Sequence, residues 1–187
     1  MIEIIEVQTK RQLKEFIKFP DKLYRGNKYR VPQMHIFERT SLSRAKNPAF
    51  DFCEARYWMA YKNGQLVGRI AGIINHKANE LWNDKAARFG WIDFIDDVEV
   101  SAALLKTVED WAIAKGLKKL QGPLGFTDMD LEGMLVEGFE ELSTQIAIYN
   151  YPYYPVHLEN FQYSKDVDWV QFEIEVPEKI PDKVQRV

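Results

Sequence analysis

Two runs of apolar, β-branched and aromatic residues lie on either side of the dipeptide Asn63-Gly64, over residues 55–62 and 65–74. An Asn-Gly pair between two such runs favours a tight type I′ turn, because both turn positions need a positive φ. The sequence therefore predicts a β-hairpin. With 187 residues, of which 46% are apolar, the chain can bury a core around this hairpin without disulfides or metals.

Further strands and helices are expected before and after the hairpin. The expected strands cover 2–8, 88–95, 117–120, 144–149 and 167–176, and the expected helices cover about 10–18, 75–87, 98–116 and 155–162. Thr9 is a suitable N-cap for the first helix and Pro20 is expected to end it. The irregular stretch over 21–52 is expected to contain short helices.

The order of these elements predicts one α+β domain over residues 1–176, with a mostly antiparallel central sheet flanked by helices. Residues 88–120 form a β-α-β unit in this prediction, and Gly116 ends its helix. We expect residues 177–187 to form a tail that leads to a further C-terminal region.

The overall charge is nearly balanced, with 25 basic and 28 acidic residues, and this balance is not that of a dedicated nucleic-acid-binding protein. The single cysteine, Cys53, fits a reducing cytoplasm and is more typical of a buried strand residue than of a nucleophile. The sequence contains neither a signal peptide pattern nor an apolar run of about 18 residues. We therefore expect a soluble cytoplasmic protein without a membrane partner.

The basic residues are concentrated near the N-terminus. Residues 1–50 contain 11 basic and 5 acidic side chains, a surplus of 6, whereas residues 51–187 contain 14 and 23. A basic stretch can attract an anionic ligand such as a nucleotide phosphate. The alternative, which we favour, is that Lys10, Arg11, Lys14 and Lys18 form the solvated face of an amphipathic helix.

Several common catalytic and metal-binding patterns are absent. No phosphate-binding G-x-x-x-x-G-K-[ST] loop, dinucleotide-binding G-x-G-x-x-G loop or G-x-S-x-G nucleophile elbow occurs. The three histidines are too far apart in sequence to suggest a zinc site. Asp128, Asp130 and Glu132 alternate as in a calcium loop, but a solvated or capping loop is favoured because the distal glutamate is missing. We expect no metal.

Three segments resemble the GNAT superfamily of acyl-CoA-dependent N-acyltransferases. They are the hairpin AYKNGQLVGRIAGI, the strand-helix-strand segment GWIDFIDDVEVSAALLKTVEDWAIAKGLKKL and the late helix NYPYYPVHLENFQY. The block over 122–155 is also similar to a group of longer bacterial proteins related to this superfamily. The resemblance implies a GNAT fold, acetyl-CoA or a longer acyl-CoA as cofactor, and a small-molecule amine or a protein as acceptor.

The segment that corresponds to the family's pyrophosphate loop, Q/R-x-x-G-x-G/A, is altered. Asp96 stands at the arginine position, and Glu99 and Ser101 stand at the glycine positions. Glycines and free N–H groups at a helix start bind phosphates, whereas carboxylates repel them. Asp96-x-x-Glu99 has instead the spacing of a capping box, which we favour over phosphate binding.

The resemblance also implies roles for single residues. Leu158 stands where many members have the tyrosine that protonates the leaving thiolate, so Tyr154, one turn earlier, is the candidate acid and Asp93 the candidate base. The backbone around Phe94 and Ile95 would supply an oxyanion N–H group. The candidate cofactor-binding residues are Phe94, Ile95, Asp96, Ser101, Ala102 and Asn150.

Asp93 and the tyrosines also have a structural interpretation. Asp93 would face outward from its strand, and Tyr151, Tyr153 and Tyr154 would form a packed turn before the last helix. Two functional hypotheses follow. The chain is an acyl-CoA-dependent N-acyltransferase, or it is a catalytically inactive GNAT-like binding or structural domain of a longer protein. In the second case it would pair with a second GNAT-like domain or form a homodimer.

Overall fold

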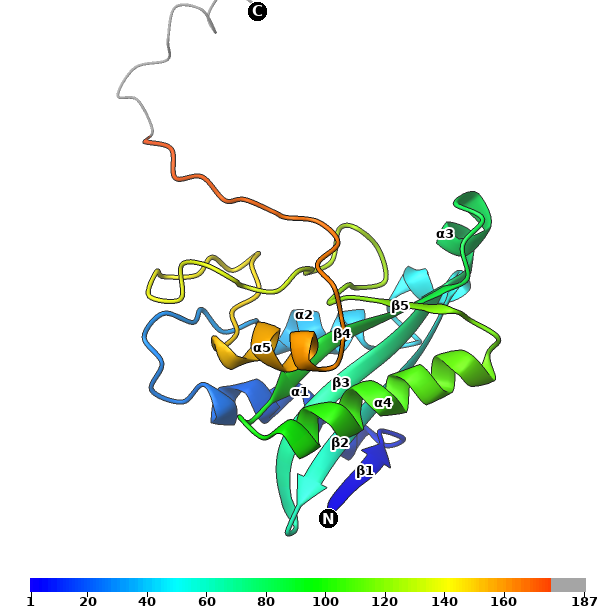
Figure 1. Ribbon diagram of the computed structural model, residues 1–187, viewed down its shortest axis with the longest axis horizontal. Coiled ribbons are helices and arrows are strands. Elements are labelled where there is room, and N and C mark those ends of the chain that lie inside the picture. Colours follow the sequence, from blue (N-terminus) through cyan, green and yellow to red (C-terminus); the bar gives the residue numbers. More distant parts are fainter. Residues whose placement is uncertain (176–187) are drawn as a thin grey trace, which may run out of the picture.

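The computed structural model describes residues 1–175 and has a five-stranded sheet at its centre, in the order β1-β2-β3-β4-β5 (Figure 1). The strands are β1 (Ile2–Glu6), β2 (Cys53–Lys62), β3 (Gln65–Asn75), β4 (Ala86–Phe94) and β5 (Lys119–Gln121). Only β4 and β5 pair in parallel, and α4 (Val98–Ala114) connects them. The predicted α+β class and the β-α-β unit are confirmed, and the predicted tail over 177–187 lies outside the described residues.

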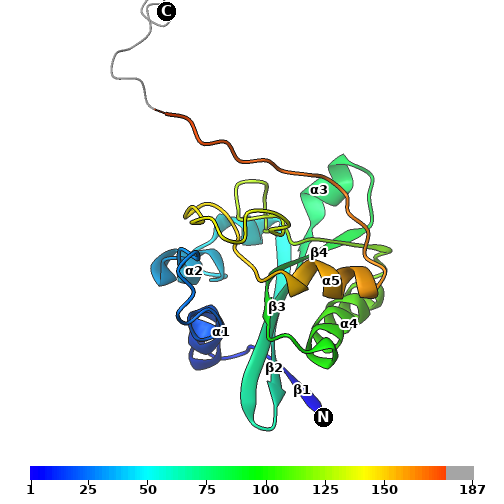
Figure 2. The same ribbon diagram turned by 60° about the vertical axis from the view of Figure 1, so that its left-hand side comes forward.

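Helices cover both faces of the sheet (Figure 2). One face packs against α4 and α5 (Tyr153–Asn160), in a core that includes Phe89 and Leu104. The other face packs against α1 (Lys10–Leu23) and the segment that contains α2 (His35–Ser41), in a second core that includes Phe16 and Met59. The remaining short elements are a 3₁₀ helix, η1 (Pro48–Asp51), and α3 (His76–Leu81). The short helices expected in the stretch over 21–52 are therefore present.

The hairpin forms as predicted. Asn63 and Gly64 adopt φ values of 53° and 74°, so both turn residues are left-handed as a type I′ turn requires. Further along β3, a Cβ on Gly68 would lie 2.8 Å from the Cδ1 atom of Leu104. The absence of a side chain at Gly68 therefore allows α4 to lie directly against β3.

The strand β4 contains a bulge at Trp91. Arg69 pairs with Asp93 and Ala71 pairs with Gly90, so Trp91 and Ile92 together stand opposite a single residue of β3. Trp91 has a φ of 45°, which is rare for a bulky side chain. Bulges of this kind redirect side chains, often beside functional sites. The sequence pattern did not indicate it.

The prediction that α1 ends before Pro20 is wrong, because the helix continues to Leu23. Pro20 has no N–H group and leaves the carbonyl oxygen of Phe16 without its helical donor. The Nη1 atom of Arg69 donates to this oxygen at 3.0 Å. A side chain from β3 thus satisfies the acceptor that the proline leaves free. Thr9 caps the helix as expected, in a capping box with Gln12.

Two predicted strands do not form among the described residues. Residues 144–149 form no strand, with a turn at 145–146, and Ser143 just before them donates its N–H to the carbonyl of Tyr29. The segment over 167–175 is extended but pairs with no described strand, although its apolar residues alternate. The strand β5, at one edge of the sheet, has only three residues. The exposed apolar side chains, 61–82% accessible, are Val167, Trp169, Val170, Phe172 and Ile174.

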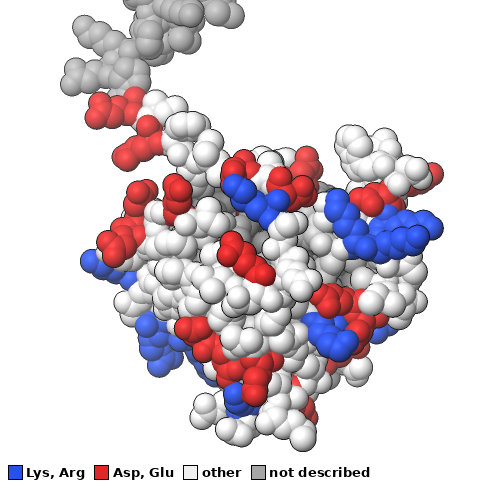
Figure 3. Space-filling view, viewed as in Figure 1, with Lys and Arg blue, Asp and Glu red and all other residues white. Residues whose placement is uncertain are grey.

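On the face formed by α4 and α5, acidic and basic side chains are interspersed with uncharged ones (Figure 3). This face therefore carries no continuous patch of one charge. The basic side chains of α1, Lys10, Arg11, Lys14 and Lys18, are exposed to solvent as the amphipathic interpretation expected. Within the described part of the chain, no helix has the length and apolar character needed to cross a membrane.

Candidate functional site

A pocket lies at the bulge of β4, between the sheet, α1 and the loops that follow β5. Its polar lining comes mainly from α1, α2, β3 and β4, and its apolar lining comes mainly from the loops. The side chains that line the pocket include Tyr24, Arg30, Glu38, Arg69, Trp91, Asp93, Leu131, Met134, Ile148, Asn150 and Tyr154.

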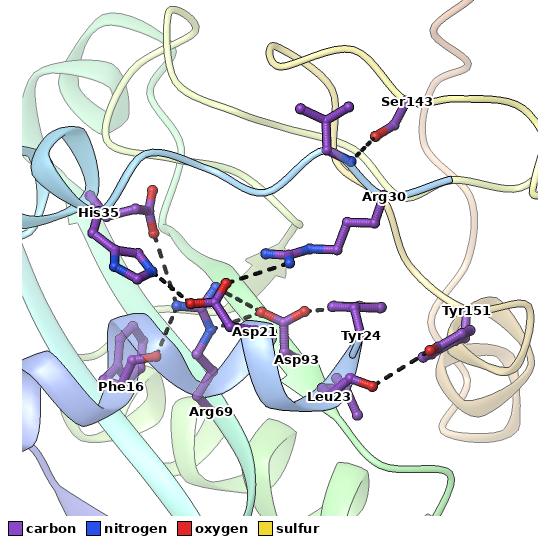
Figure 4. Close-up of polar contacts among 12 residues, drawn as sticks. Phe16, Asp21, Leu23, Tyr24, Arg30, His35, Arg69, Asp93, Ser143 and Tyr151 are labelled. Atoms are coloured by element: carbon purple, nitrogen blue, oxygen red, sulfur yellow. Dashed lines mark hydrogen bonds and ion pairs between the residues drawn. The ribbon is translucent and has the colours of Figure 1, made fainter. Parts of the chain in front are cut away.

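The floor of the pocket is a buried ion pair between Arg69 and Asp93 (Figure 4). The Nε and Nη2 atoms of Arg69 lie 2.8 and 2.7 Å from Oδ2 of Asp93. The other carboxylate oxygen accepts a hydrogen bond from the Tyr24 hydroxyl at 3.0 Å. Asp93 is thus buried and held on both oxygens, and it does not face outward as the structural interpretation assumed. Its role as a base stays a prediction.

Tyr24 and Tyr154 complete this network. Their hydroxyl oxygens are 2.9 Å apart, and that of Tyr154 lies 3.4 Å from Asp93. The structure therefore brings together the predicted pair Asp93 and Tyr154. Burial, and next the charge of Asp93, raise the pKa of both tyrosines well above the usual value. Both hydroxyls consequently stay protonated and can act as hydrogen-bond donors.

Glu38 of α2 is a pocket residue that sequence analysis missed. Its Oε2 atom accepts a hydrogen bond from the indole N–H of Trp91 at 2.9 Å and lies 3.9 Å from Nη1 of Arg69. Burial raises the pKa of Glu38, and the charge of Arg69 opposes this effect. A hint was available in the sequence, because Glu38 is the only acidic residue between Asp21 and Asp51.

The resemblance places the acyl-CoA between the end of β4 and the start of α4, and we call this place the cleft. The helix α5 packs against both elements there. The hydroxyl of Tyr154 accepts the N–H of Phe94 at 3.1 Å, and the hydroxyl of Tyr153 donates to the Phe94 carbonyl at 2.6 Å. The rings of Phe94 and Tyr154 stack with centroids 4.2 Å apart. The N–H of Ile95 bonds the carbonyl of Val67 at 3.0 Å. The N–H groups of Phe94 and Ile95, one of which was expected to hold an oxyanion, are thus both paired within the chain.

The start of α4 is capped by Asp97, so the predicted capping box of Asp96 and Glu99 is wrong by one residue. Asp97 has an extended backbone with φ −149°, and its side chain accepts the N–H of Glu99 at 3.0 Å. The helix begins at Val98, and the cap must be the residue that directly precedes it. Lys62, at the end of β2, bridges Asp97 and Glu99. The expected repulsion of phosphate by these carboxylates is therefore reduced by a neighbouring cation.

His157 of α5 links two of the predicted cofactor-binding residues. Its Nδ1 atom lies 2.8 Å from Oγ of Ser101 and its Nε2 atom lies 3.0 Å from Oδ1 of Asp96. Ala102 follows on α4 and is half-buried. Leu158, at the position of the family's tyrosine, is buried in the core under α4 and α5.

Asn150 lies in the pocket and not in the cleft. Its side chain accepts the N–H of Leu135 at 2.7 Å and donates to the Leu135 carbonyl at 3.0 Å. These two bonds hold the loop that forms the apolar wall. The predicted cofactor residues are thus divided between two places, with Phe94, Ile95, Asp96 and Ser101 at the cleft.

These contacts occupy several groups that the resemblance assigns to acyl-CoA. A pyrophosphate at a helix start needs free N–H groups, but those of Glu99, Val100 and Ser101 all bond Asp97. No metal cluster of three or more His, Cys, Asp or Glu is found over residues 1–175. Asp130 instead accepts the N–H of Thr127 at 3.0 Å, as a capping loop would. Cys53 is buried, and burial raises the pKa of its thiol to about 11.

The chain is similar to two curated bacterial proteins, and no protein-family model matches it. It is 36% identical over 167 residues to protein YghO of Escherichia coli K12, covering 87% of this chain and 43% of that protein. It is 27% identical over 186 residues to the bacterial ceramide synthase of Caulobacter vibrioides, covering 99% of this chain and 48% of that protein. The chain thus spans about half the length of these relatives.

Solved structures with the same arrangement of strands and helices are acetyltransferases with little sequence identity. A predicted acetyltransferase from Clostridium acetobutylicum, solved with acetyl-CoA, has a TM-score of 0.51 and 10% identity, over 92% of this chain and 96% of that one. A tandem GNAT protein of clavulanic acid biosynthesis has a TM-score of 0.51 and 14% identity, over 64% of this chain and 35% of that one. The chain therefore has the GNAT fold of the N-acyltransferases.

Proposed function

We propose that the chain is a GNAT-fold domain of a longer N-acyltransferase, in which it binds the acyl acceptor and not acyl-CoA. The observation that carries this proposal is the position of α5. Tyr154 takes the backbone N–H of Phe94, and His157 joins Asp96 to Ser101 at the start of α4. These three groups, which were expected to hold the cofactor, are bonded inside the domain.

Binding of acyl-CoA in this cleft would require several of these contacts to break. Tyr154 is fully buried and its ring stacks on Phe94. His157, also buried, would lose two polar partners. A buried polar group that loses its hydrogen bond costs about 1–3 kcal/mol. Breaking these internal bonds to bind a ligand would therefore cost much of the free energy that the new bonds supply. The packing supports a domain that uses its GNAT fold without the cofactor.

The relatives support the class of the acceptor. One of them is named as a ceramide synthase, and a ceramide is an amide of a fatty acid with a long-chain amino alcohol. An amine acceptor fits a pocket that combines carboxylates, tyrosines and apolar loops. The relatives are about twice as long as this chain, and one structural neighbour is a tandem GNAT protein. In this proposal a second GNAT-like domain supplies the acyl-CoA site.

A titration with acyl-CoA tests the proposal. We expect acetyl-CoA and palmitoyl-CoA at millimolar concentration to leave the unfolding midpoint of the 187-residue chain unchanged, because a ligand stabilises a protein only if it binds the folded state. The Clostridium acetyltransferase that was solved with acetyl-CoA is the positive control. A saturable rise of the midpoint with either thioester would refute the proposal.

A second candidate function is that this domain itself transfers the acyl group. The observation in its favour is Glu38, a buried carboxyl beside the bulge of β4, where a raised pKa suits a group that accepts a proton from an amine. It requires α5 to leave the cleft. Formation of an N-acyl product by the isolated chain would establish this function, and the same titration would then show acyl-CoA binding.

A further inference from the structure

We infer that the pocket binds a primary amine as its ammonium ion, with the carboxylate of Glu38 as the charged partner. The inference rests on the proposed function for the chemical class of the ligand, and it goes further by naming the residue that recognises it. Four observations support it: the charge balance of the pocket floor, the free oxygen of Glu38, the bulge that fixes Glu38, and the apolar wall above it.

The buried polar groups of the floor contain more negative than positive charge. Glu38 and Asp93 both lie within 4 Å of the one guanidinium of Arg69, and all three side chains are at most 11% exposed. Asp93 takes the short contacts, at 2.7 and 2.8 Å, whereas Glu38 remains at 3.9 Å. One cation cannot neutralise two buried carboxylates, so a proton or a cationic ligand must balance the second.

The other charged groups near the pocket are already paired with each other. Arg30 lies 3.6 Å from Oδ1 of Asp21, and the Nε2 atom of His35 lies 2.7 Å from Oδ2 of the same residue. Figure 4 shows Asp21 between these two side chains, beside the Arg69–Asp93 pair. Arg30 is therefore not available to balance Glu38, and the unmatched charge stays with the carboxylate at Arg69.

Glu38 offers one oxygen to a ligand. Its Oε2 atom takes the indole N–H of Trp91 and faces Arg69, while no residue of the described chain donates to Oε1. The oxygen is not among the fully buried polar atoms without a partner, so it keeps some accessible surface, and Glu38 is one of the residues that line the pocket. An ammonium group placed there would form a charge-assisted hydrogen bond, which is stronger than a neutral one.

The bulge of β4 holds Glu38 in this position. Trp91 adopts a left-handed backbone, with φ 45°, and its indole N–H points to Glu38. Rare backbone conformations of bulky residues persist where the surrounding structure fixes them, and they cluster at binding sites. A fixed carboxylate loses less conformational entropy when a ligand binds, so the bulge prepares the site for a small cation.

The wall opposite these charges suits an alkyl substituent. Leu131, Met134 and Ile148 line the pocket and are half-buried, so an apolar chain attached to the ammonium group could cover them. Burial of apolar surface would then add to the affinity by roughly 0.8 kcal/mol for each methylene, about a fourfold change in the dissociation constant. The expected ligand is an amine with an alkyl chain.

The experiment compares hexylammonium chloride with hexan-1-ol as probes, measured by calorimetric titration at pH 7.5 with no thioester present. We expect hexylammonium to bind the chain more tightly than hexanol, because only the amine can pair with Glu38. In Glu38→Gln the affinity for hexylammonium should fall by about 10- to 100-fold, the loss of one hydrogen bond to a charged group. Glu80→Gln, which removes an exposed carboxylate on α3, should bind hexylammonium as the original chain does.

Trp91→Phe provides a second variant that keeps both carboxylates but removes the donor that positions Glu38, and its affinity should fall by less than that of Glu38→Gln. Equal affinity for the alcohol and the amine, an unchanged affinity in Glu38→Gln, or an equal loss in Glu80→Gln would each overturn the inference. If Glu38→Gln does not fold, an unchanged affinity in Trp91→Phe overturns it. If acyl-CoA binds the chain while hexylammonium still depends on Glu38, the proposed function fails and this inference stands.

Discussion

Replacement of Arg69 by methionine should destabilise the chain strongly, because it leaves two carboxylates without their cation. Arg69 is 6% exposed and donates to Asp93 through two nitrogen atoms and to the carbonyl of Phe16 through a third. Loss of one partner of a buried ion pair costs about 3–5 kcal/mol, since the remaining charge stays buried. We therefore expect Arg69→Met to lower the free energy of unfolding by about 3–5 kcal/mol at pH 7.

The assay is equilibrium unfolding in urea, followed by circular dichroism, with Arg56→Met as the matched control. Arg56 is also a strand arginine, but its pair with Glu6 is 3.6 Å long and both side chains are 36–42% exposed. The control should lose less than about 1 kcal/mol, as exposed ion pairs do. Adding Asp93→Asn to Arg69→Met should recover part of the loss. A loss for Arg69→Met no larger than the control's, or no recovery in the double variant, would refute the reasoning.

Three further predictions concern the cap of α4, the carboxyl of Glu38 and the contact of α4 with β3. Asp97→Ala should lower the free energy of unfolding in urea by about 1 kcal/mol, and Asp96→Ala should lower it clearly less, because only Asp97 caps the helix. A larger loss for Asp96→Ala would favour the capping box that was predicted from sequence. Burial raises the pKa of Glu38 above 4.5, so the protonated side chain stabilises the folded state relative to the ionised one. This contribution to stability is fully present below pH 4.5 and is lost as the pH rises through the pKa of Glu38 in the folded state. The unfolding free energy of Glu38→Gln relative to the original chain should therefore increase as the pH rises above 4.5 in urea titrations without ligand, and a flat difference would contradict the burial effect. Gly68→Ala should cost about 1–3 kcal/mol, because its Cβ would lie 2.8 Å from Leu104, and a neutral substitution would show that α4 can shift.

The elements that were predicted from sequence are those with local signals. Asn63-Gly64 specifies its turn by backbone conformation alone, and Gly116, with φ 75°, ends the last turn of α4 where a left-handed residue was expected. The order of these elements carries the resemblance to the GNAT fold. Neither signal depends on a residue far away in the chain, so both could be recognised without a structure.

The parts that could not be predicted depend on partners distant in sequence. Glu38 belongs to the pocket only because the bulge of β4 directs Trp91 toward it, 53 residues further along the chain. Lys62 reaches the start of α4 from the end of β2, and it moderates the charge of the two carboxylates there. The spacing of Asp96 and Glu99 described a plausible cap, but local spacing does not fix at which residue a helix begins.

The prediction of a cofactor site in the cleft was limited in the same way, because the contacts there involve residues that are distant in sequence. The departure from the family's pyrophosphate loop was visible in the sequence at Asp96, Glu99 and Ser101, whereas the residues of α5 that contact Asp96 and Ser101 were not. Tyr154 and His157 lie on a helix that follows more than 30 residues of turns after β5. Only the packing of that helix shows that Tyr154, the candidate acid, bonds the strand from within the domain.

The proline inside α1 has a mechanical consequence. Because the guanidinium of Arg69 donates to the carbonyl of Phe16, a direct hydrogen bond joins the first helix of the chain to the middle of the sheet. If a ligand moves that guanidinium, the hydrogen bond to the Phe16 carbonyl changes directly, and the backbone of α1 is affected. The amide protons that follow Pro20, beginning with Asp21, are thus a natural place to detect occupancy, by hydrogen exchange or by chemical shift, without a label in the pocket itself.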